Sequence, residues 1–143
     1  MKCVDVNVLV YAHRADLPEH RDYRSLLEQL GNGEEPLGLP EIVLSGFVRV
    51  LTNRRIFREP TTSQAAWEAV DRLLEAPAAV RLQTGERHWG LFRQLADDID
   101  ARGNDVADAY LAAYAIDNNA TWLSADRGFA RFRRLRWSHP LSR

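Results

Sequence analysis

The chain has 143 residues, of which 45% are hydrophobic and 27% are charged, and its formal net charge is −1. These values predict one globular domain over residues 1–143 with a core of its own, and they exclude a strongly basic nucleic-acid coat. The single cysteine, Cys3, excludes an intrachain disulfide and predicts a buried thiol in a reducing, cytoplasmic compartment. No apolar run approaches the roughly 18 residues of a membrane helix, and Asp5 interrupts the N-terminal apolar run too early for a signal peptide.

Short apolar runs alternate with segments of helical periodicity along the whole chain. Strands are predicted at residues 1–5, 37–39, 79–83, 120–123 and 135–137. Helices are predicted between them at 8–13, 19–30, 41–52, 63–75, 86–102 and 105–118, with a helical turn at 127–132. Strands that are separated by helices pair in parallel and carry helices on both faces. The sequence therefore predicts an α/β fold, a three-layer α/β/α sandwich around a short and mostly parallel central sheet.

Four carboxylates fall where a predicted strand ends or a predicted helix begins. Asp5 and Asp126 each follow an apolar strand, whereas Glu41 and Asp108 lie in the first turn of a helix. In open α/β sheets, ligand sites form at the carboxyl ends of the strands. Carboxylates that gather without cations repel one another, and hard cations such as Mg²⁺ or Mn²⁺ prefer oxygen ligands. The pattern predicts a metal-dependent enzyme that cleaves phosphodiester bonds.

Each of these carboxylates also has a purely structural explanation. Asp5 and Asp126 are of the residue type that caps helix N-termini. Glu41 stands at a helix start, where the helix dipole favours a negative charge whatever the function. A shared site explains the four positions by one cause, whereas capping needs a separate cause for each.

Polar residues next to these carboxylates leave two interpretations open. Asn7 follows the first carboxylate by two residues and either orients it by a hydrogen bond or belongs to a simple turn. Ser124 precedes the last carboxylate by two residues and is a candidate cap for the next turn. Asp105 lies three residues before Asp108, so both can point to the same end of the helix, and Asp105 or Asn104 is its simplest cap.

The same segments resemble the PIN-domain family, and within it the VapC-type toxins of bacterial toxin–antitoxin systems. The matching segments are residues 4–9, 40–41, 103–113 and 123–132, and the resemblance spans the whole chain. It implies an endoribonuclease that depends on Mg²⁺, with Mn²⁺ able to substitute, and that hydrolyses RNA by a metal-activated water. It also implies a small cognate antitoxin that covers the site, and a homodimer.

The resemblance carries the family's site residues onto this chain position by position. It implies catalytic roles for the residues at the family's four acidic positions, which are Asp5, Glu41, Asp108 and Asp126. Three of them, Asp5, Asp108 and Asp126, are the implied metal ligands. Asn7 matches the family's polar residue after the first Asp, and Ser124 matches its small hydroxyl residue before the last. Asp105 matches less well than Asp108, which directly precedes the alanine run.

Two groups of arginines, at residues 49–58 and 127–136, are candidate contacts to the RNA backbone. Guanidinium groups bind phosphates in a bidentate manner and position a backbone without reading its sequence. We select Arg49, Arg127 and Arg131 as the candidate phosphate contacts. The alternative is a solvated face, or a surface that meets an acidic partner.

Two other functions also place carboxylates at strand ends. A phosphotransfer enzyme with a nucleophilic Asp needs a second Asp two residues later and a lysine further on. This chain has Asn7 at the first position and no lysine after Lys2, which argues against that class. A non-catalytic module, in which the acidic cluster is a structural metal site or a partner surface, remains as the alternative. Metal-dependent turnover distinguishes it from an endoribonuclease.

Overall fold

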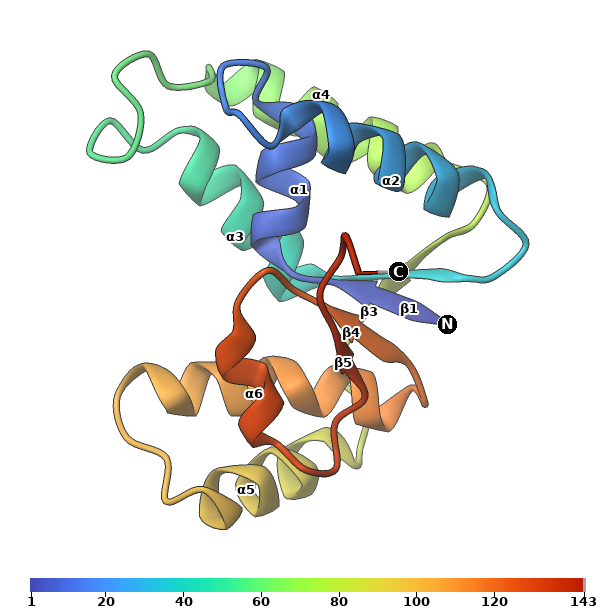
Figure 1. Cartoon of the computed structure of the whole chain (residues 1–143), viewed down its shortest axis with the longest axis vertical. Helices are drawn as coiled ribbons and strands as arrows, with labels where there is room; N and C mark the ends of the chain where they lie inside the picture. Colours follow the sequence, from blue (N-terminus) through green and yellow to red (C-terminus); the bar gives the residue numbers. More distant parts are fainter. Residues whose placement is uncertain (143) are drawn as a thin grey trace.

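A parallel sheet of five strands forms the centre of the computed structural model, which describes residues 1–142 (Figure 1). The strands are β1 (Lys2–Val4), β2 (Leu37–Pro40), β3 (Ala79–Leu82), β4 (Thr121–Leu123) and β5 (Trp137–Ser138). Their order is β3-β2-β1-β4-β5, and every neighbouring pair is parallel. The chain winds outward on one side of β1 and then on the other, so the switch point lies between β1 and β4. A ligand site is expected at the carboxyl ends of these two strands.

Helices cover both faces of the sheet, as the sequence predicts. They are α1 (Val6–His13), α2 (His20–Asn32), α3 (Glu41–Leu51), α4 (Ser63–Glu75), α5 (His88–Asp98), α6 (Asn104–Asp117) and the 3-10 helix η1 (Arg127–Arg131). Figure 1 shows α1 to α4 on one side of the sheet and α5 and α6 on the other. The predicted three-layer α/β/α sandwich is therefore confirmed. None of the helices in residues 1–142 is long and apolar enough to cross a membrane.

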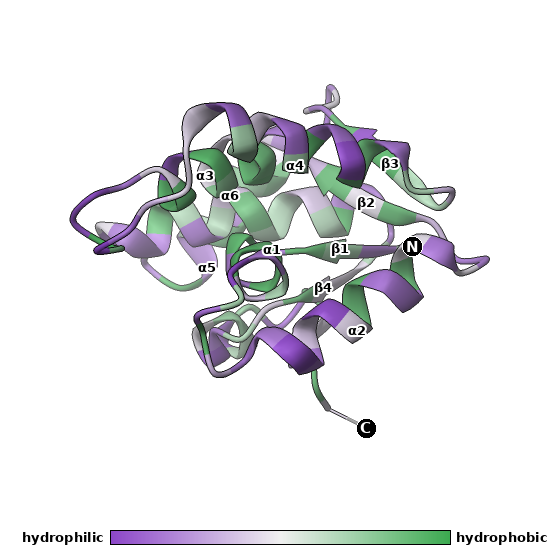
Figure 2. Ribbon diagram, turned by 90° about the horizontal axis from the view of Figure 1, so that it is seen from above, coloured by the Kyte–Doolittle hydropathy of each residue, from purple (hydrophilic) through white to green (hydrophobic). Residues whose placement is uncertain are grey.

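The apolar periodicity of the sequence becomes the core between these layers. Figure 2 shows hydrophobic residues along the central strands and hydrophilic residues on much of the outward side of α2. Trp122 of β4 and Phe47 of α3 are among the largest fully buried side chains. On α6, alanines occupy the buried positions 109, 112, 113 and 115. Small side chains let this helix pack close to its neighbours, which brings its first turn to the edge of the sheet.

Three element boundaries differ from the sequence prediction for identifiable reasons. The expected helix 86–102 is shorter, and Asp100 after it takes a left-handed φ of 50° that no helix continues through. Helix α6 has Gly103 as its cap, with no side-chain cap bond, so the predicted capping by Asp105 or Asn104 is wrong. Helix α2 continues through Gly31, which is buried against α4.

Cys3 and Gly38 face each other across the two central strands β1 and β2, where they are register partners. The Cys3 thiol is fully buried, as predicted, and burial raises its pKa to about 12. A Cβ atom on Gly38 would lie 2.6 Å from Cys3 Sγ and 2.9 Å from Leu82 Cδ1. Only a glycine leaves room for the thiol at this position.

Gly38→Ala is therefore expected to lower the free energy of unfolding by about 1–3 kcal/mol, the usual effect of overpacking a core. Gly90 on α5 provides a matched control, because a Cβ there would meet nothing within 4 Å. Gly90→Ala should raise stability by about 0.5–1 kcal/mol, since alanine loses less backbone freedom in a helix. Urea unfolding of both variants measures the difference, and equal effects would contradict this account of Gly38.

Candidate active site

Asp5 is the most buried carboxylate at the carboxyl edge of the sheet, with only 7% of its surface exposed. It is the cap of α1, and its Oδ1 accepts the Val6 N–H at 2.7 Å. Its Oδ2 accepts the Ser124 hydroxyl at 2.6 Å. The capping role and the buried site position thus apply to the same side chain.

The environment of Asp5 opposes its negative charge. Burial is the largest cause that raises the pKa of Asp5, and the negative charges of Asp108 and Asp126 raise it further. Hydrogen bonds from Ser124 and from the Val6 N–H act in the opposite direction without cancelling the rise. The ionised form of Asp5 is therefore unfavourable in these surroundings, and a nearby cation would stabilise it.

Ser124 and Asn7 join the ends of β1 and β4 through their side chains. The Ser124 oxygen donates its proton to Asp5 and accepts from the Asn7 amide at 3.1 Å and from the Asp126 N–H at 3.0 Å. Asn7 Nδ2 also lies 3.4 Å from Asp5 Oδ2, and Asn7 Oδ1 accepts the Ala125 N–H at 3.1 Å. Of the two interpretations for Asn7, the structure supports the one in which it orients Asp5.

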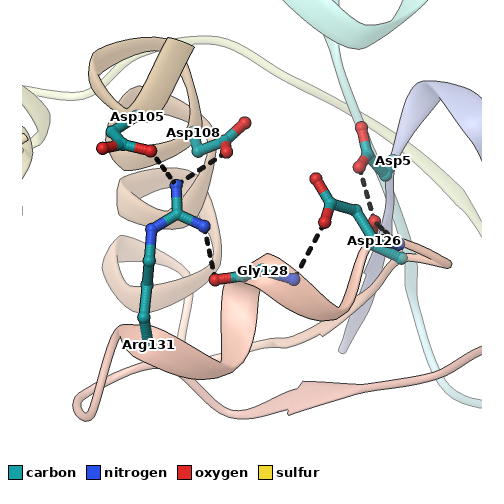
Figure 3. A network of polar contacts seen from close by, with 7 residues as sticks. Asp5, Asp105, Asp108, Asp126, Gly128 and Arg131 are labelled. Atoms are coloured by element: carbon teal, nitrogen blue, oxygen red, sulfur yellow. Dashed lines mark hydrogen bonds and ion pairs between the residues drawn. The ribbon is translucent and has the colours of Figure 1, made fainter. Parts of the chain in front are cut away.

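Asp126 caps η1 directly after β4, and its Oδ1 accepts the Gly128 N–H at 2.8 Å. Asp108 enters from the first turns of α6, on the opposite face of the sheet from α1. Figure 3 shows the carboxylates of Asp5, Asp108 and Asp126 turned toward a common space. Three chain segments that are far apart in the sequence therefore contribute one carboxylate each.

Asp105 and Asp108 share one guanidinium. Arg131 Nη2 lies 3.0 Å from Asp105 Oδ1 and 2.8 Å from Asp108 Oδ2, and Arg131 Nη1 donates to the Gly128 carbonyl (Figure 3). The donors of Arg131 are directed at these carboxylates and at the Gly128 carbonyl, and its contact with an RNA phosphate stays a prediction. Arg49 and Arg127 are exposed.

Glu41 lies at the same edge of the sheet, but its side chain does not join the aspartates. Its Oε2 pairs with Arg81 Nε at 3.5 Å and accepts from Gln83 Nε2 at 3.3 Å, both next to β2. The carboxylate is 44% exposed. The Glu41 carboxylate therefore pairs with Arg81 rather than with the aspartates, because Arg81 offers it an opposite charge where the aspartates would repel it.

The donor set fits a hard divalent cation by its chemistry. Asp5, Asp108 and Asp126 offer oxygen atoms only, the ligand type that Mg²⁺ and Mn²⁺ prefer, and burial, with a further effect of the charges of Asp108 and Asp126, raises the pKa of Asp5. Within residues 1–142, no three His, Cys, Asp or Glu side chains are already arranged around one point as metal ligands.

Two features of the site are absent from the sequence predictions. One is the ion pairing of Arg131, which only charge balance around the aspartates would have suggested. The other is a cleft of about 570 Å³ between α3 and α6, lined by Val6 and Ala107, the chain neighbours of Asp5 and Asp108. Arg49, Phe92 and Tyr110 also line this cleft, and no periodic signal in the sequence brings them together.

Comparison with known proteins places these residues in a family. Residues 2–135 match the family model of the PIN domain. Ribonuclease VapC43 from Mycobacterium tuberculosis is 76% identical over 141 residues, which cover 99% of this chain and 96% of that protein. Ribonuclease VapC25 from the same organism is 39% identical over 140 residues, which cover 98% of this chain and 99% of that protein.

Two solved structures share the fold at low sequence identity. VapBC2 from Rickettsia felis, bound to a DNA fragment from their promoter, matches with a TM-score of 0.72 and 20% identity over 96% of this chain and 97% of that chain. VapBC-1 from nontypeable Haemophilus influenzae matches with a TM-score of 0.71 and 16% identity over 99% of this chain and 98% of that chain. The arrangement of helices around the sheet is thus conserved where most residues differ.

The charge crowding at Asp5 predicts a pH dependence of stability. Because the pKa of Asp5 is raised, the folded protein holds this proton more tightly than the unfolded chain does, so ionising Asp5 lowers the free energy of unfolding. This loss is absent below the ordinary pKa of about 3.9 and grows as the pH rises toward the folded-state pKa. The stability of Asp5→Asn relative to wild type should therefore increase as the pH rises above about 4 in EDTA.

Asp16 supplies a control of opposite sign, because its hydrogen bond from Arg14 lowers the pKa of Asp16. Its contribution is fully present above the ordinary pKa of about 3.9 and is lost only as the pH falls below it, so the relative stability of Asp16→Asn should be constant above about pH 5 and should rise as the pH falls toward about 2. Thermal unfolding from about pH 2 to about pH 7 measures both trends. A stability difference for Asp5→Asn that does not change with pH would refute the charge crowding, because altered hydrogen bonds alone give a constant offset.

Proposed function

This chain belongs to the PIN-domain family, and from that premise we propose that it is a divalent-metal-dependent endoribonuclease, the toxin of a toxin–antitoxin pair. The observation that carries the proposal is the meeting of the Asp5, Asp108 and Asp126 carboxylates at the switch point of the sheet. The 76% identity with Ribonuclease VapC43 supports the activity. Phosphodiester hydrolysis at such a cluster needs a cation, and we propose Mg²⁺, with Mn²⁺ able to substitute.

Asp5, Asp108 and Asp126 would hold the cation. The bound ion supplies an acidified water and neutralises charge on the phosphate oxygens. Ser124 and Asn7 keep the Asp5 carboxylate in one orientation through their hydrogen bonds to Oδ2, since groups behind a metal ligand fix its direction.

Glu41 keeps the role that the family match implies, at the outer edge of the site. To reach the aspartates, its side chain must leave Arg81 and Gln83, and its 44% exposure leaves it free to turn. We propose that Arg49 and Arg127, both exposed, contact RNA phosphates.

The assembly of the protein is also proposed from the family and from its surface. VapBC2 and VapBC-1 are the structural neighbours, and we propose that a small cognate antitoxin binds this chain. A cavity of about 310 Å³ between α1, α2 and α4 is lined by Leu27 and Leu73, among other residues. We propose that the apolar face of an antitoxin helix binds in this cavity. We propose a homodimer through α3 and α6, where Ile42 and Val106 are 44% and 38% exposed beside the cleft.

RNA cleavage tests the activity directly. Purified protein should cleave a pool of structured RNAs with Mg²⁺ or Mn²⁺ and should not do so in EDTA. Asp5→Asn and Asp108→Asn should lose more than about 100-fold in rate, and Ser124→Ala about 10–100-fold, the usual effect of removing a residue that orients a ligand. Asp16→Asn, which changes a carboxylate outside the site, should keep the wild-type rate.

Three outcomes of this assay would count against the proposal. Cleavage in EDTA, or cleavage by Asp5→Asn at the wild-type rate, would exclude the metal site at these aspartates. Metal binding by folded, partner-free protein without cleavage of any RNA in the pool would favour the non-catalytic module.

Light scattering tests the proposed dimer face. Ile42→Asp places a charge on this face and should shift the protein from dimer to monomer, because a charge buried in an apolar interface must be desolvated. Ile56, which is 51% exposed in the loop after α3, provides the matched control. Ile56→Asp should leave the dimer intact, and a wild-type protein that is monomeric at all concentrations would refute the dimer.

A further inference from the structure

Arg131 is the one cation that pairs with the aspartate cluster, defined here as Asp5, Asp105, Asp108 and Asp126, within residues 1–142. Its Nη2 lies between Asp105 and Asp108 and is within hydrogen-bond distance of both. The side chain is 30% exposed, and Asp108 is 23% exposed. Ion pairs that are partly removed from water are screened less than surface pairs, so this contact bears on the charge of the cluster.

Gly128 connects this guanidinium to the turn that carries Asp126. Its N–H donates to Asp126 Oδ1 and its carbonyl accepts from Arg131 Nη1, so one residue contacts both (Figure 3). A Cβ atom on Gly128 would lie 2.6 Å from Arg131 Nη1 and 2.9 Å from Asp126 Oδ1. The turn at Gly128 therefore packs tightly against Arg131. Through these contacts Arg131 links Asp105 and Asp108 of α6 to the turn that carries Asp126.

The aspartates, rather than ideal bonding of the arginine, set the position of this guanidinium. Arg131 Nε is buried and has no hydrogen-bond partner, and a buried donor without a partner is unfavourable. The guanidinium carbon of Arg131 lies over the Phe132 ring, 4.8 Å from its centre. The charge-assisted hydrogen bonds to Asp105 and Asp108 offset the unfavourable free energy of leaving Nε without a partner.

We propose that Arg131 is the internal counter-ion of the aspartate cluster, which keeps the metal-free site assembled and competes with the divalent cation for Asp108. This inference rests on the metal-dependent function proposed above. Two cations that draw on one carboxylate weaken each other's interaction with it, and this coupling is reciprocal. Arg131 thus stabilises the cluster before metal binds and, by the same interaction, lowers the affinity of the site for metal.

Manganese binding to the full-length protein tests this competition by calorimetry. Arg131→Met keeps a long, unbranched side chain but removes the charge, and it should bind Mn²⁺ at least about fivefold more tightly than wild type, the lower end of usual coupling. Its unfolding temperature should fall in EDTA and recover more than that of wild type when Mn²⁺ is added. Arg131→Lys keeps a charge without the planar fork, so its Mn²⁺ affinity should lie between those of wild type and Arg131→Met.

Arg14 provides a matched control away from the cluster. Its guanidinium lies 4.0 Å from the centre of the Phe57 ring, pairs with Asp16 and donates to the Glu59 carbonyl, as Arg131 does with its own ring, aspartates and carbonyl. Arg14→Met should lose stability equally with and without Mn²⁺ and should bind Mn²⁺ as wild type does. A purely structural role for Arg131 would give this same pattern in Arg131→Met.

The outcomes separate this inference from the proposed function. Mn²⁺ binding by wild type, with equal or weaker binding by Arg131→Met, would overturn the competition alone. An absence of Mn²⁺ binding by wild type would overturn the metal site of the proposed function and this inference with it. If Arg131→Met does not fold at any Mn²⁺ concentration, Arg131→Lys decides: tighter binding than wild type supports the inference, and equal or weaker binding overturns it.

Discussion

Repulsion among the carboxylates at the carboxyl edge of the sheet is the constraint around which this molecule is arranged. Asp5 is buried beside the charges of Asp108 and Asp126, and its pKa is raised accordingly. Two kinds of contact hold the carboxylates there. Neutral donors, the Ser124 hydroxyl and the Val6 N–H, stabilise Asp5, and the cation of Arg131 pairs with Asp108. A hard metal ion would relieve the remaining charge, which connects the electrostatics of the fold to the proposed hydrolysis.

The topology explains why these groups meet at all. In the order β3-β2-β1-β4-β5, the chain leaves β1 and β4 toward opposite faces of the sheet. This leaves a crevice at the carboxyl ends of these two strands, where ligands bind in such sheets. Asp5 follows β1 directly, Asp126 lies three residues after β4, and Ser124 donates a hydrogen bond across to Asp5. Helix α6 adds Asp108 from the other layer, since its buried alanines let it pack closely. The same few residues thus cap helices and form the site.

Relatives and neighbours place this arrangement in a wider context. Ribonuclease VapC25 shares 39% of its residues with this chain, whereas VapBC2 shares only 20% and still matches with a TM-score of 0.72. A fold that is shared at such low sequence identity can host many functions. The functional conclusion therefore rests on the site and not on the fold. In this chain the site includes Arg131 and Gly128, which join the turn of Asp126 to the helix of Asp108.

Much of the architecture follows from the sequence, because apolar periodicity and turn residues are local properties. The layers, the parallel sheet and the segments that carry Asp5, Asp108 and Asp126 are predictable in this way. The helix ends near Asp100 and Gly103 are not predictable in this way. Both residues have a positive φ, which the local sequence pattern does not indicate.

The sequence by itself determined which carboxylates stand at strand ends and helix starts. Only the tertiary structure decided where each side chain points. Glu41 turns to Arg81 of β3, and Arg131 turns to Asp105 and Asp108. The physical reason is that an ion pair is chosen by distance in space and by burial, and neither can be read from spacing along the chain.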